Sequence, residues 1–82
     1  MNVTFSSRGT NYTATPQDIF MENGISRMFI KGGKNASFSV NNVLLSAKEW
    51  QRIKDSLVPI DYEKYYGRKP LVQGVIIYQV KQ

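Results

Sequence analysis

The most constraining feature of the sequence is a helix whose first turn is marked by two separate signals. Ser46 is a good N-cap, because its hydroxyl can accept a hydrogen bond from the amide three residues later. That residue is Glu49, whose carboxylate has the spacing to reach back to the Ser46 amide and complete a capping box. Leu45 and Trp50 have the spacing of a hydrophobic staple across the same helix start. We therefore predict that a short strand over 43–45 enters the helix at a fixed angle.

The helix is predicted to run over 47–58 and to present one apolar face. Trp50, Ile53 and Leu57 follow helical spacing. Pro59 cannot continue a helix and is expected to end it. An isolated helix needs roughly 12–15 residues to be even marginally stable in water. The apolar face must therefore pack on a sheet or on a second copy of the same helix.

Cysteine and histidine are absent from the 82 residues, which removes several kinds of site. Disulfides, thiolate metal sites, ordinary zinc sites, histidine general bases and nucleophiles paired with histidine are all excluded. A chain of this length forms one domain over 1–82, and its thin core would often depend on disulfides, metals or oligomerisation. Oligomerisation is the support that remains, and we expect no metal and no cofactor.

The acidic residues do not indicate an enzyme. Two pairs of carboxylates could each share a face, namely Asp18 with Glu22 and Asp61 with Glu63. Neither pair has a histidine, a metal motif or an apolar surrounding that would adapt it to acid–base chemistry. We therefore expect no catalysis and no small-molecule substrate.

The chain carries a formal net charge of +5. This excess is compatible with a nucleic-acid partner but does not identify one. The start of the sequence lacks the charged residues and apolar run of a signal peptide. No apolar run approaches the roughly 18 residues of a membrane-spanning helix. We expect an intracellular protein without a membrane partner.

Alternating apolar and polar residues predict several strands before the helix. The clearest signal is Asn23-Gly24 between two apolar-rich runs, because both positions of a tight hairpin turn favour positive φ. Residues 9–11 also have the composition of a turn, and Pro16 ends the strand that follows them. The predicted strands are 2–8, 12–15, 18–22, 25–31, 36–40 and 43–45.

A last strand is predicted over 71–80. It is so apolar that it must be paired or covered, since a free edge of this kind invites aggregation. The polar and aromatic residues 61–70 before it are interpreted as an ordered connection. The predicted fold class is therefore α+β, with antiparallel strands, one α-helix and a C-terminal strand.

Basic and aromatic residues are interleaved through the predicted strands, as in surfaces that bind single-stranded nucleic acid. Rings stack on bases for about 1–3 kcal/mol each, and cations follow the phosphates. Residues two apart in a strand share a face, so Arg27, Phe29 and Lys31 project together and leave Met28 and Ile30 to the core. The alternative is that Phe29 is a core residue and the charges form a solvated rim. The candidate binding residues are Arg8, Tyr12, Arg27, Phe29, Lys31 and Lys34.

Two other segments allow both a functional and a structural interpretation. The glycines between Lys31 and Lys34 would let amides converge on a phosphate, but tight hairpin turns use the same residues. Tyr62, Tyr65 and Tyr66 lie among basic residues, and they would either stack on bases or pack against the domain.

Residues 42–50 resemble the end of the core domain of the eukaryotic transcriptional coactivator positive cofactor four family. The family pattern is roughly Gly-Ile-Ser-Leu-Asn-Pro-Glu-Gln-Trp, and this chain has Asn-Val-Leu-Leu-Ser-Ala-Lys-Glu-Trp. Leu45, the polar cap Ser46 and Trp50 line up, and an amphipathic helix follows. Counted back without gaps, Phe29 falls on a strand aromatic that stacks on DNA in the family.

The resemblance implies a curved antiparallel β-sheet of about four strands followed by one α-helix, paired into a homodimer through the helices. The two sheets would form grooves for single-stranded DNA with little sequence preference, in support of transcription, replication or recombination. Residues 1–58 would be the core and 59–82 an extension that carries the C-terminal strand. The binding residues named above would line the groove. Trp50, Ile53 and Leu57 would hold the helix on the sheet and on its partner.

Three departures from the family pattern bear on this groove. Asn41 and Asn42 stand where the family has basic residues, and the loop after Phe29 differs. Lys31 and Lys34 would replace part of the missing charge. A strand also follows the helix where the family core ends. A compact chain of this kind would suit a bacterial or viral member.

The alternative function is protein docking. A small viral or bacterial interaction protein would bind a host protein through the apolar strand Val75–Val80 as a docking edge, or through its basic surface. RNA in place of DNA is the other open choice of partner.

Overall fold

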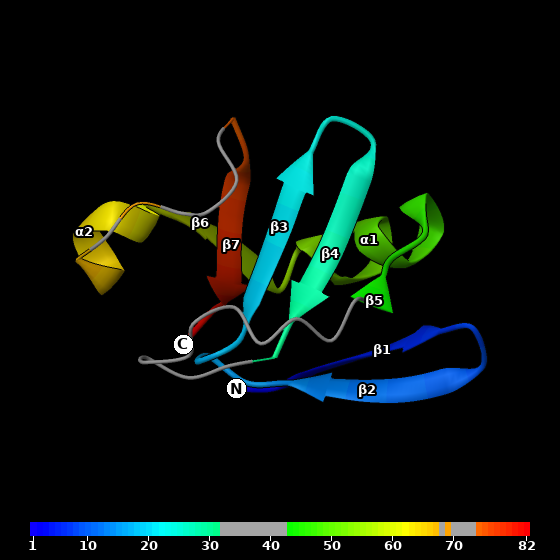
Figure 1. Ribbon diagram of the computed structural model, residues 1–82. Helices are drawn as coiled ribbons and strands as arrows, with labels where there is room; N and C mark the ends of the chain where they lie inside the picture. The colour runs from blue at the N-terminus through cyan, green and yellow to red at the C-terminus, as the bar shows by residue number, and fades with distance from the viewer. Residues whose placement is uncertain (32–42, 68, 70–73) are drawn as a thin grey trace.

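The computed structural model describes residues 1–31, 43–67, 69 and 74–82, without the side chains of Tyr65 and Tyr66. These residues form a small α+β fold of mostly antiparallel strands with two short helices (Figure 1). In chain order the elements are β1 (Val3–Ser7), β2 (Thr10–Ala14), β3 (Ile19–Asn23), β4 (Ser26–Ile30), β5 (Val43–Leu44), α1 (Ala47–Lys54), β6 (Leu57–Ile60), α2 (Tyr62–Tyr66) and β7 (Ile76–Val80). Lys34 and the predicted strand 36–40 lie outside the described residues.

The described strands form two sheets. β1 and β2 make a two-stranded hairpin, and the larger sheet has the order β5-β4-β3-β7-β6 with every neighbouring pair antiparallel. The last strand, β7, lies inside the larger sheet between β3 and β6. The expectation that the C-terminal strand is paired is therefore confirmed. Its proposed role as a docking edge is wrong, because both of its edges are already bonded.

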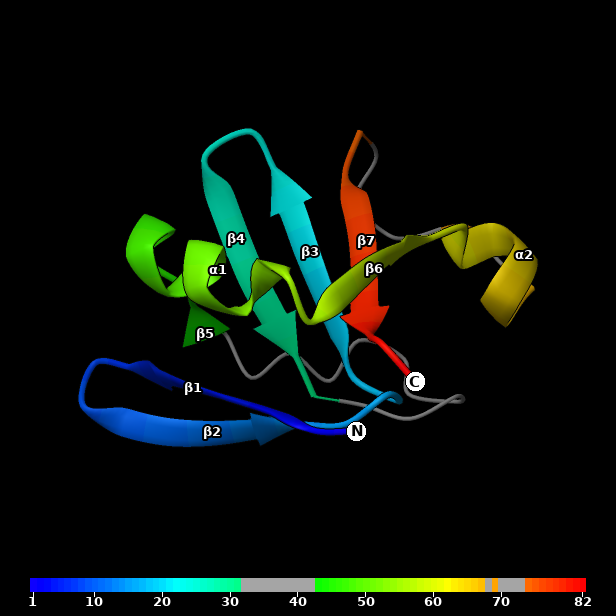
Figure 2. The same cartoon turned by 180° about the vertical axis from the view of Figure 1, so that it is seen from behind.

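The larger sheet buries side chains on both faces. On one face, Phe20, Phe29 and Tyr78 pack with Trp50 of α1 and Phe5 of the hairpin. On the other face, a second cluster contains Ile19, Met21, Ile30, Tyr62 and Ile77. Seen from behind, α1 crosses in front of the sheet and the β1–β2 hairpin runs across the ends of its strands (Figure 2).

Phe29 is a core residue with 1% of its surface exposed. Its ring centroid lies 5.2 Å from that of Phe5 and 5.1 Å from that of Phe20. The prediction that Phe29 stacks on bases is wrong, and the alternative that it belongs to the core is confirmed. A strand with one solvated face would bury only one of two successive residues, but Phe29 and Ile30 are both buried because the sheet is covered on both sides.

The N-cap of α1 is as predicted, but the Glu49 carboxylate does not make the contact predicted for it. The Glu49 amide donates to Ser46 Oγ at 3.2 Å, which confirms the N-cap. The Glu49 carboxylate instead accepts a hydrogen bond from the backbone amide of Ser6 in β1, with Oε1 3.1 Å from the nitrogen. The side chain that was expected to close the cap therefore fastens the helix to the hairpin.

The helix ends at Lys54, one turn earlier than predicted, and Leu57 begins the strand β6. The Lys81 amide donates to the Ser56 carbonyl at 2.9 Å, so Ser56 is hydrogen-bonded toward β7. Every second residue of β6 is bonded in this way, and the backbone nitrogen of Pro59 therefore points to the outer edge of the strand. An outward position on an edge strand needs no amide donor, so proline is tolerated there. The placement of Leu57 on the helix is therefore wrong.

The residues expected to join two helices are already buried within one chain. Trp50, Ile53 and Leu57 are 1%, 2% and 5% exposed and belong to the same cluster as Phe5 and Phe29. Their predicted role in packing the helix side of the fold is confirmed. Their predicted role in dimerisation stays a prediction, although 1–5% exposure in the single chain leaves these three side chains little surface to offer a partner.

The structure differs from the prediction in two further places, the turn of the β3–β4 hairpin and the connection after β6. Asn23 pairs with Ser26, so the turn consists of Gly24 and Ile25 rather than Asn23-Gly24, with Gly24 at φ +60°. A glycine with positive φ at the first central position is typical of a type II′ hairpin turn. Residues 61–67 contain the helix α2, which Asp61 caps by accepting from the Lys64 amide at 3.3 Å.

Phe29→Ala should lower the free energy of unfolding by about 3–5 kcal/mol, because it leaves a cavity among three other rings. Urea denaturation measures this loss. Ile25→Ala is the matched control, since Ile25 is 87% exposed and its truncation should change stability by less than about 0.5 kcal/mol. Similar losses in the two variants would contradict the position of Phe29 in the core.

Candidate functional site

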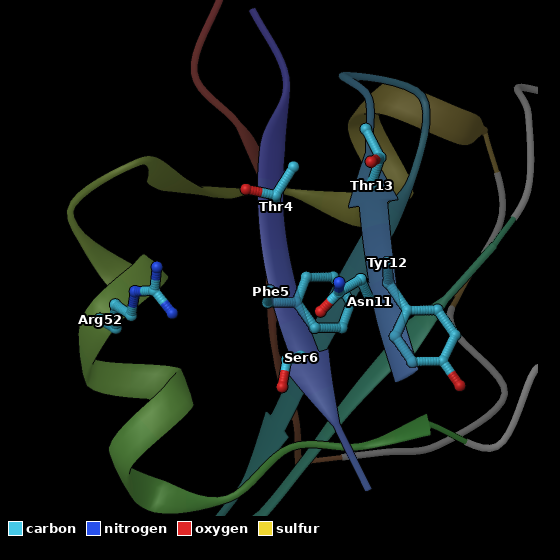
Figure 3. A pocket seen from close by; sticks show the side chains of 7 residues that line it. All are labelled: Thr4, Phe5, Ser6, Asn11, Tyr12, Thr13 and Arg52. Carbon is cyan, nitrogen blue, oxygen red and sulfur yellow. The ribbon is translucent and has the colours of Figure 1, made fainter. Parts of the chain in front are cut away.

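The outer face of the β1–β2 hairpin is polar and hollowed. Strand alternation sends Val3, Phe5 and Ala14 into the core. The side chains of the opposite face are exposed, namely Thr4, Ser6, Asn11 and Thr13. These side chains line a hollow of about 320 Å³ together with parts of Phe5 and Tyr12 and with Arg52 of α1 (Figure 3). The polar side chains that line it in the described part of the chain are hydroxyls, one amide and one guanidinium, without a carboxylate.

Arg52 borders this hollow from the helix side. Figure 3 shows its guanidinium turned toward β1 across the gap from Thr4. Its side chain is 70% exposed, and NH1 lies 3.6 Å from Oε1 of Glu49, which is 14% exposed. The same Glu49 oxygen accepts the Ser6 amide. Arg52 is not among the binding residues predicted from the sequence, although its spacing of three from Glu49 puts the two side chains on one side of the helix.

Arg8 occupies the tip of the hairpin in an unusual backbone conformation. Arg8 and Gly9 have φ angles of +50° and +79°, and Ser7 pairs with Thr10 across them. Positive φ at both central residues makes a type I′ turn, which starts one residue earlier than predicted. The left-handed conformation costs a residue with a side chain roughly 1–2 kcal/mol. An exposed arginine therefore lies at a turn position whose backbone conformation is unfavourable for it.

A second hollow, of about 270 Å³, lies beside this tip at the start of α1. It is lined by Ser6, Ser7, Arg8, Leu44, Leu45 and Ser46. Ser7 Oγ donates to the Leu44 carbonyl at 3.1 Å and holds the hairpin against β5. Ser6 lines both hollows, so they are neighbours along the line where β1 meets α1. We call this line the hairpin–helix seam and define it by Thr4, Ser6, Arg8, Ser46 and Arg52.

Tyr12 is the one predicted ring that reaches this region. It is half-buried, and one ring face is stacked on Phe5 with 5.3 Å between centroids and 15° between planes. Its ring centroid also lies 6.4 Å from that of Phe29, with 60° between the ring planes. Tyr12 therefore supports the hairpin from within and contributes only part of its ring to the first hollow.

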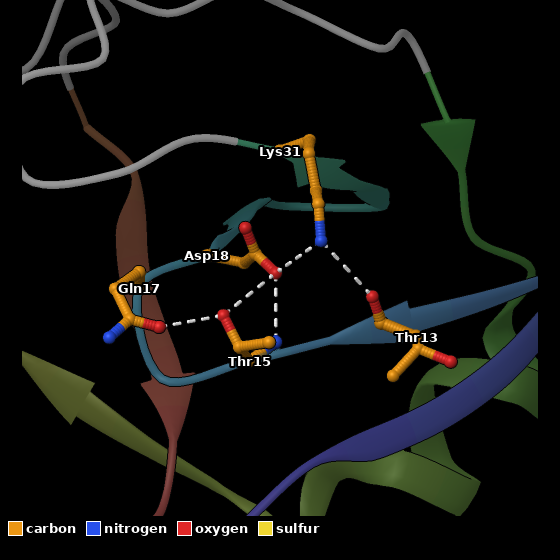
Figure 4. A network of polar contacts seen from close by, with 5 residues as sticks. All are labelled: Thr13, Thr15, Gln17, Asp18 and Lys31. Carbon is orange, nitrogen blue, oxygen red and sulfur yellow. Dashed lines mark hydrogen bonds and ion pairs between the residues drawn. The ribbon is translucent and has the colours of Figure 1, made fainter.

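Lys31 is held in a structural network on another part of the surface (Figure 4). Its Nζ lies 3.2 Å from Oδ2 of Asp18, a carboxylate with only 2% of its side chain exposed, and 3.4 Å from the Thr13 carbonyl. Asp18 also accepts the Thr15 amide at 2.8 Å. The network joins the end of β2 to the end of β4. It pairs the ammonium group of Lys31, a predicted phosphate contact, with Asp18.

Arg27 is engaged in a similar way. Its Nε lies 3.7 Å from Oε2 of Glu22, its cross-strand neighbour, and NH1 donates to the Ile25 carbonyl at 3.0 Å. Only 19% of its side chain is exposed. Of the six predicted binding residues, the structure therefore brings Arg8 and Tyr12 near the seam. It places Arg27, Phe29 and Lys31 in structural contacts, and Lys34 lies outside the described residues.

A third hollow of about 320 Å³ lies between α2 and β7 and has the opposite character. Asp61 and Glu63 line it among apolar residues, so it would repel phosphates. In the described part of the chain no group of three metal-ligating side chains is found. No described helix is long and apolar enough to cross a membrane.

Comparisons with known proteins return no matching family model, no matching curated protein and no matching solved structure.

Arg8→Asn should raise the free energy of unfolding by roughly 0.5–1 kcal/mol, because asparagine tolerates the left-handed backbone and Asn-Gly is a favoured type I′ pair. Arg8→Ala removes the same guanidinium without relieving the turn, so it should change stability by less than about 0.5 kcal/mol. Urea denaturation of the two variants tests this difference. Equal stability of the two would contradict a strained turn at Arg8.

Tyr78 should make the fold sensitive to alkaline pH. Burial, and then the nearby Glu22 carboxylate to which it is hydrogen-bonded, raise the pKa of Tyr78 above its usual 10.0. The pKa of the Tyr78 phenol is therefore higher in the folded than in the unfolded protein. Its contribution to stability is fully present below pH 10.0 and is lost as the pH rises through the pKa of the folded state. Between about pH 8 and about pH 11, the wild type should lose more stability than Tyr78→Phe in urea denaturation. Equal losses would show that the pKa is not raised.

Proposed function

We propose that the protein binds single-stranded nucleic acid through its phosphates, along the hairpin–helix seam. The observation that carries the proposal is the lining of the two neighbouring hollows. Among the described residues, each hollow is lined by one exposed arginine and several hydroxyl groups, and neither is lined by a carboxylate. Guanidinium groups and neutral donors are the groups that position phosphates in nucleic-acid complexes.

The conformation of Arg8 supports the same proposal. An asparagine or glycine at this position would fit the type I′ turn better. Strained backbone persists where another requirement outweighs its cost, and such sites are often functional. The guanidinium at the tip of the hairpin is the feature that a better turn residue would remove.

The shape of the seam favours a single strand over a duplex. Side chains on one face of a β-strand repeat every ~6.6–6.8 Å, which is close to the spacing of phosphates along an extended single strand. Duplex readers insert a projecting helix or ribbon into a groove about 12 Å wide, whereas the seam is recessed. Base stacking is not part of the proposal, because the described rings are buried, apart from the half-buried Tyr12.

Fluorescence anisotropy with a labelled oligothymidylate tests the proposal. Two phosphate contacts predict that log K falls against log salt with a slope of about −1.4, and that single strands bind more tightly than duplex. Arg52→Gln and Arg8→Asn should each make the slope less negative by about 0.7. Lys64→Gln is the control, because it removes one exposed charge from α2, far from the hairpin in both views (Figures 1 and 2).

Three results would count against the proposal. If the protein does not bind the oligothymidylate at low salt, the proposed function is wrong. Equal affinity for duplex would remove the preference for single strands. An effect of Lys64→Gln as large as those of the two arginine variants would place the contact away from the seam. The same titration with an oligouridylate tells DNA and RNA apart.

The alternative of protein docking is retained only for the basic surface. An acidic protein surface would engage the same two arginines, Arg8 and Arg52. Polyglutamate is a simple probe for this chemistry. If polyglutamate displaces the oligonucleotide at equal charge concentration, the seam recognises negative charge in general rather than phosphates.

A further inference from the structure

We infer that Glu49 limits the affinity of the hairpin–helix seam for phosphates while it holds the seam in shape. This inference rests on the proposed function. Glu49 Oε1 accepts the Ser6 amide at 3.1 Å and lies 3.6 Å from NH1 of Arg52. Because Ser6 lines both hollows, the carboxylate is anchored between them.

The shaping role follows from the hydrogen bond to Ser6. β1 has hydrogen-bonding groups on the edge that faces α1, and the Ser6 amide is one of them. The bond ties the first turn of α1 to β1 near the C-terminal end of the strand, and it sets the distance between the helix and the hairpin. Arg52, one turn later, is thereby placed at the rim of the first hollow. Glu49 is therefore a positioning residue for Arg52.

The limiting role follows from its charge. The pair of Glu49 and Arg52 is too long for a direct hydrogen bond, and the Arg52 side chain remains 70% exposed, so the guanidinium is available to a ligand. A phosphate that reaches it also approaches the Glu49 carboxylate, and the two negative charges repel. In water, like charges about 4 Å apart weaken binding by about fivefold, or about 1 kcal/mol.

Glu49→Gln separates the two roles. Glutamine keeps an oxygen that can accept the Ser6 amide, but it carries no charge. We expect this variant to bind the labelled oligothymidylate about two- to fivefold more tightly than the wild type at low salt. Glu49→Ala removes the charge and the anchor together, so its gain should be smaller than that of Glu49→Gln.

Glu63→Gln is the matched control. It changes the net charge by the same amount from an exposed position on α2, and it should leave the affinity within about 1.5-fold of the wild type. Equal gains in Glu49→Gln and Glu63→Gln would overturn the inference, because the effect would then come from net charge alone. Weaker binding by Glu49→Gln would also overturn it. If the wild type binds no oligonucleotide at all, the proposed function fails first, and that result is distinct from the other two.

Discussion

The contact between Phe5 and Phe29 holds the β1–β2 hairpin on the larger sheet and so makes the two sheets one folded unit. The β1–β2 hairpin shares no described strand pairing with the larger sheet, so side chains must hold it in place. Phe5 lies 5.2 Å from Phe29 and 5.8 Å from Phe20, in edge-to-face geometry. Such ring pairs add about 0.5–1.5 kcal/mol each beyond the area they bury. A two-stranded hairpin is marginal alone in water, and this packing is what stabilises it here.

The same packing creates the candidate site. Alternation along β1 sends Phe5 inward and leaves Thr4 and Ser6 on the solvent side. The hairpin rests on the sheet beside α1, and the Ser6–Glu49 hydrogen bond closes the line between them. Core and site are therefore two faces of one hairpin. A change that loosened Phe5 would also widen the seam, so binding and stability are expected to fall together for core variants and separately for surface variants.

Local signals were sufficient to predict several elements from the sequence. The Ser46 cap, the β3–β4 hairpin and the paired C-terminal strand depend on neighbouring residues or on composition, and each is present. The errors came from tertiary context. Proline was expected to end the helix, but Pro59 lies on the outward edge of a strand, where it removes no bond. The pattern of period two predicts a solvated position for Phe29, because such a pattern does not reveal that both faces of a sheet are covered.

The site was harder to predict than the fold because charge alone does not tell which cations are engaged. Strand register places Arg27 opposite Glu22, and the end of β4 brings Lys31 to the buried Asp18. Both pairings follow from the register of the β3–β4 hairpin, which is set by a turn at Gly24-Ile25 and not at the predicted Asn23-Gly24. Arg8 differs, because no ion pair is found for it among the described residues and its backbone is strained. In a type I′ turn the fold alone would favour asparagine or glycine. An arginine there is a poor choice for folding, so its guanidinium is the group whose role most needs a functional explanation.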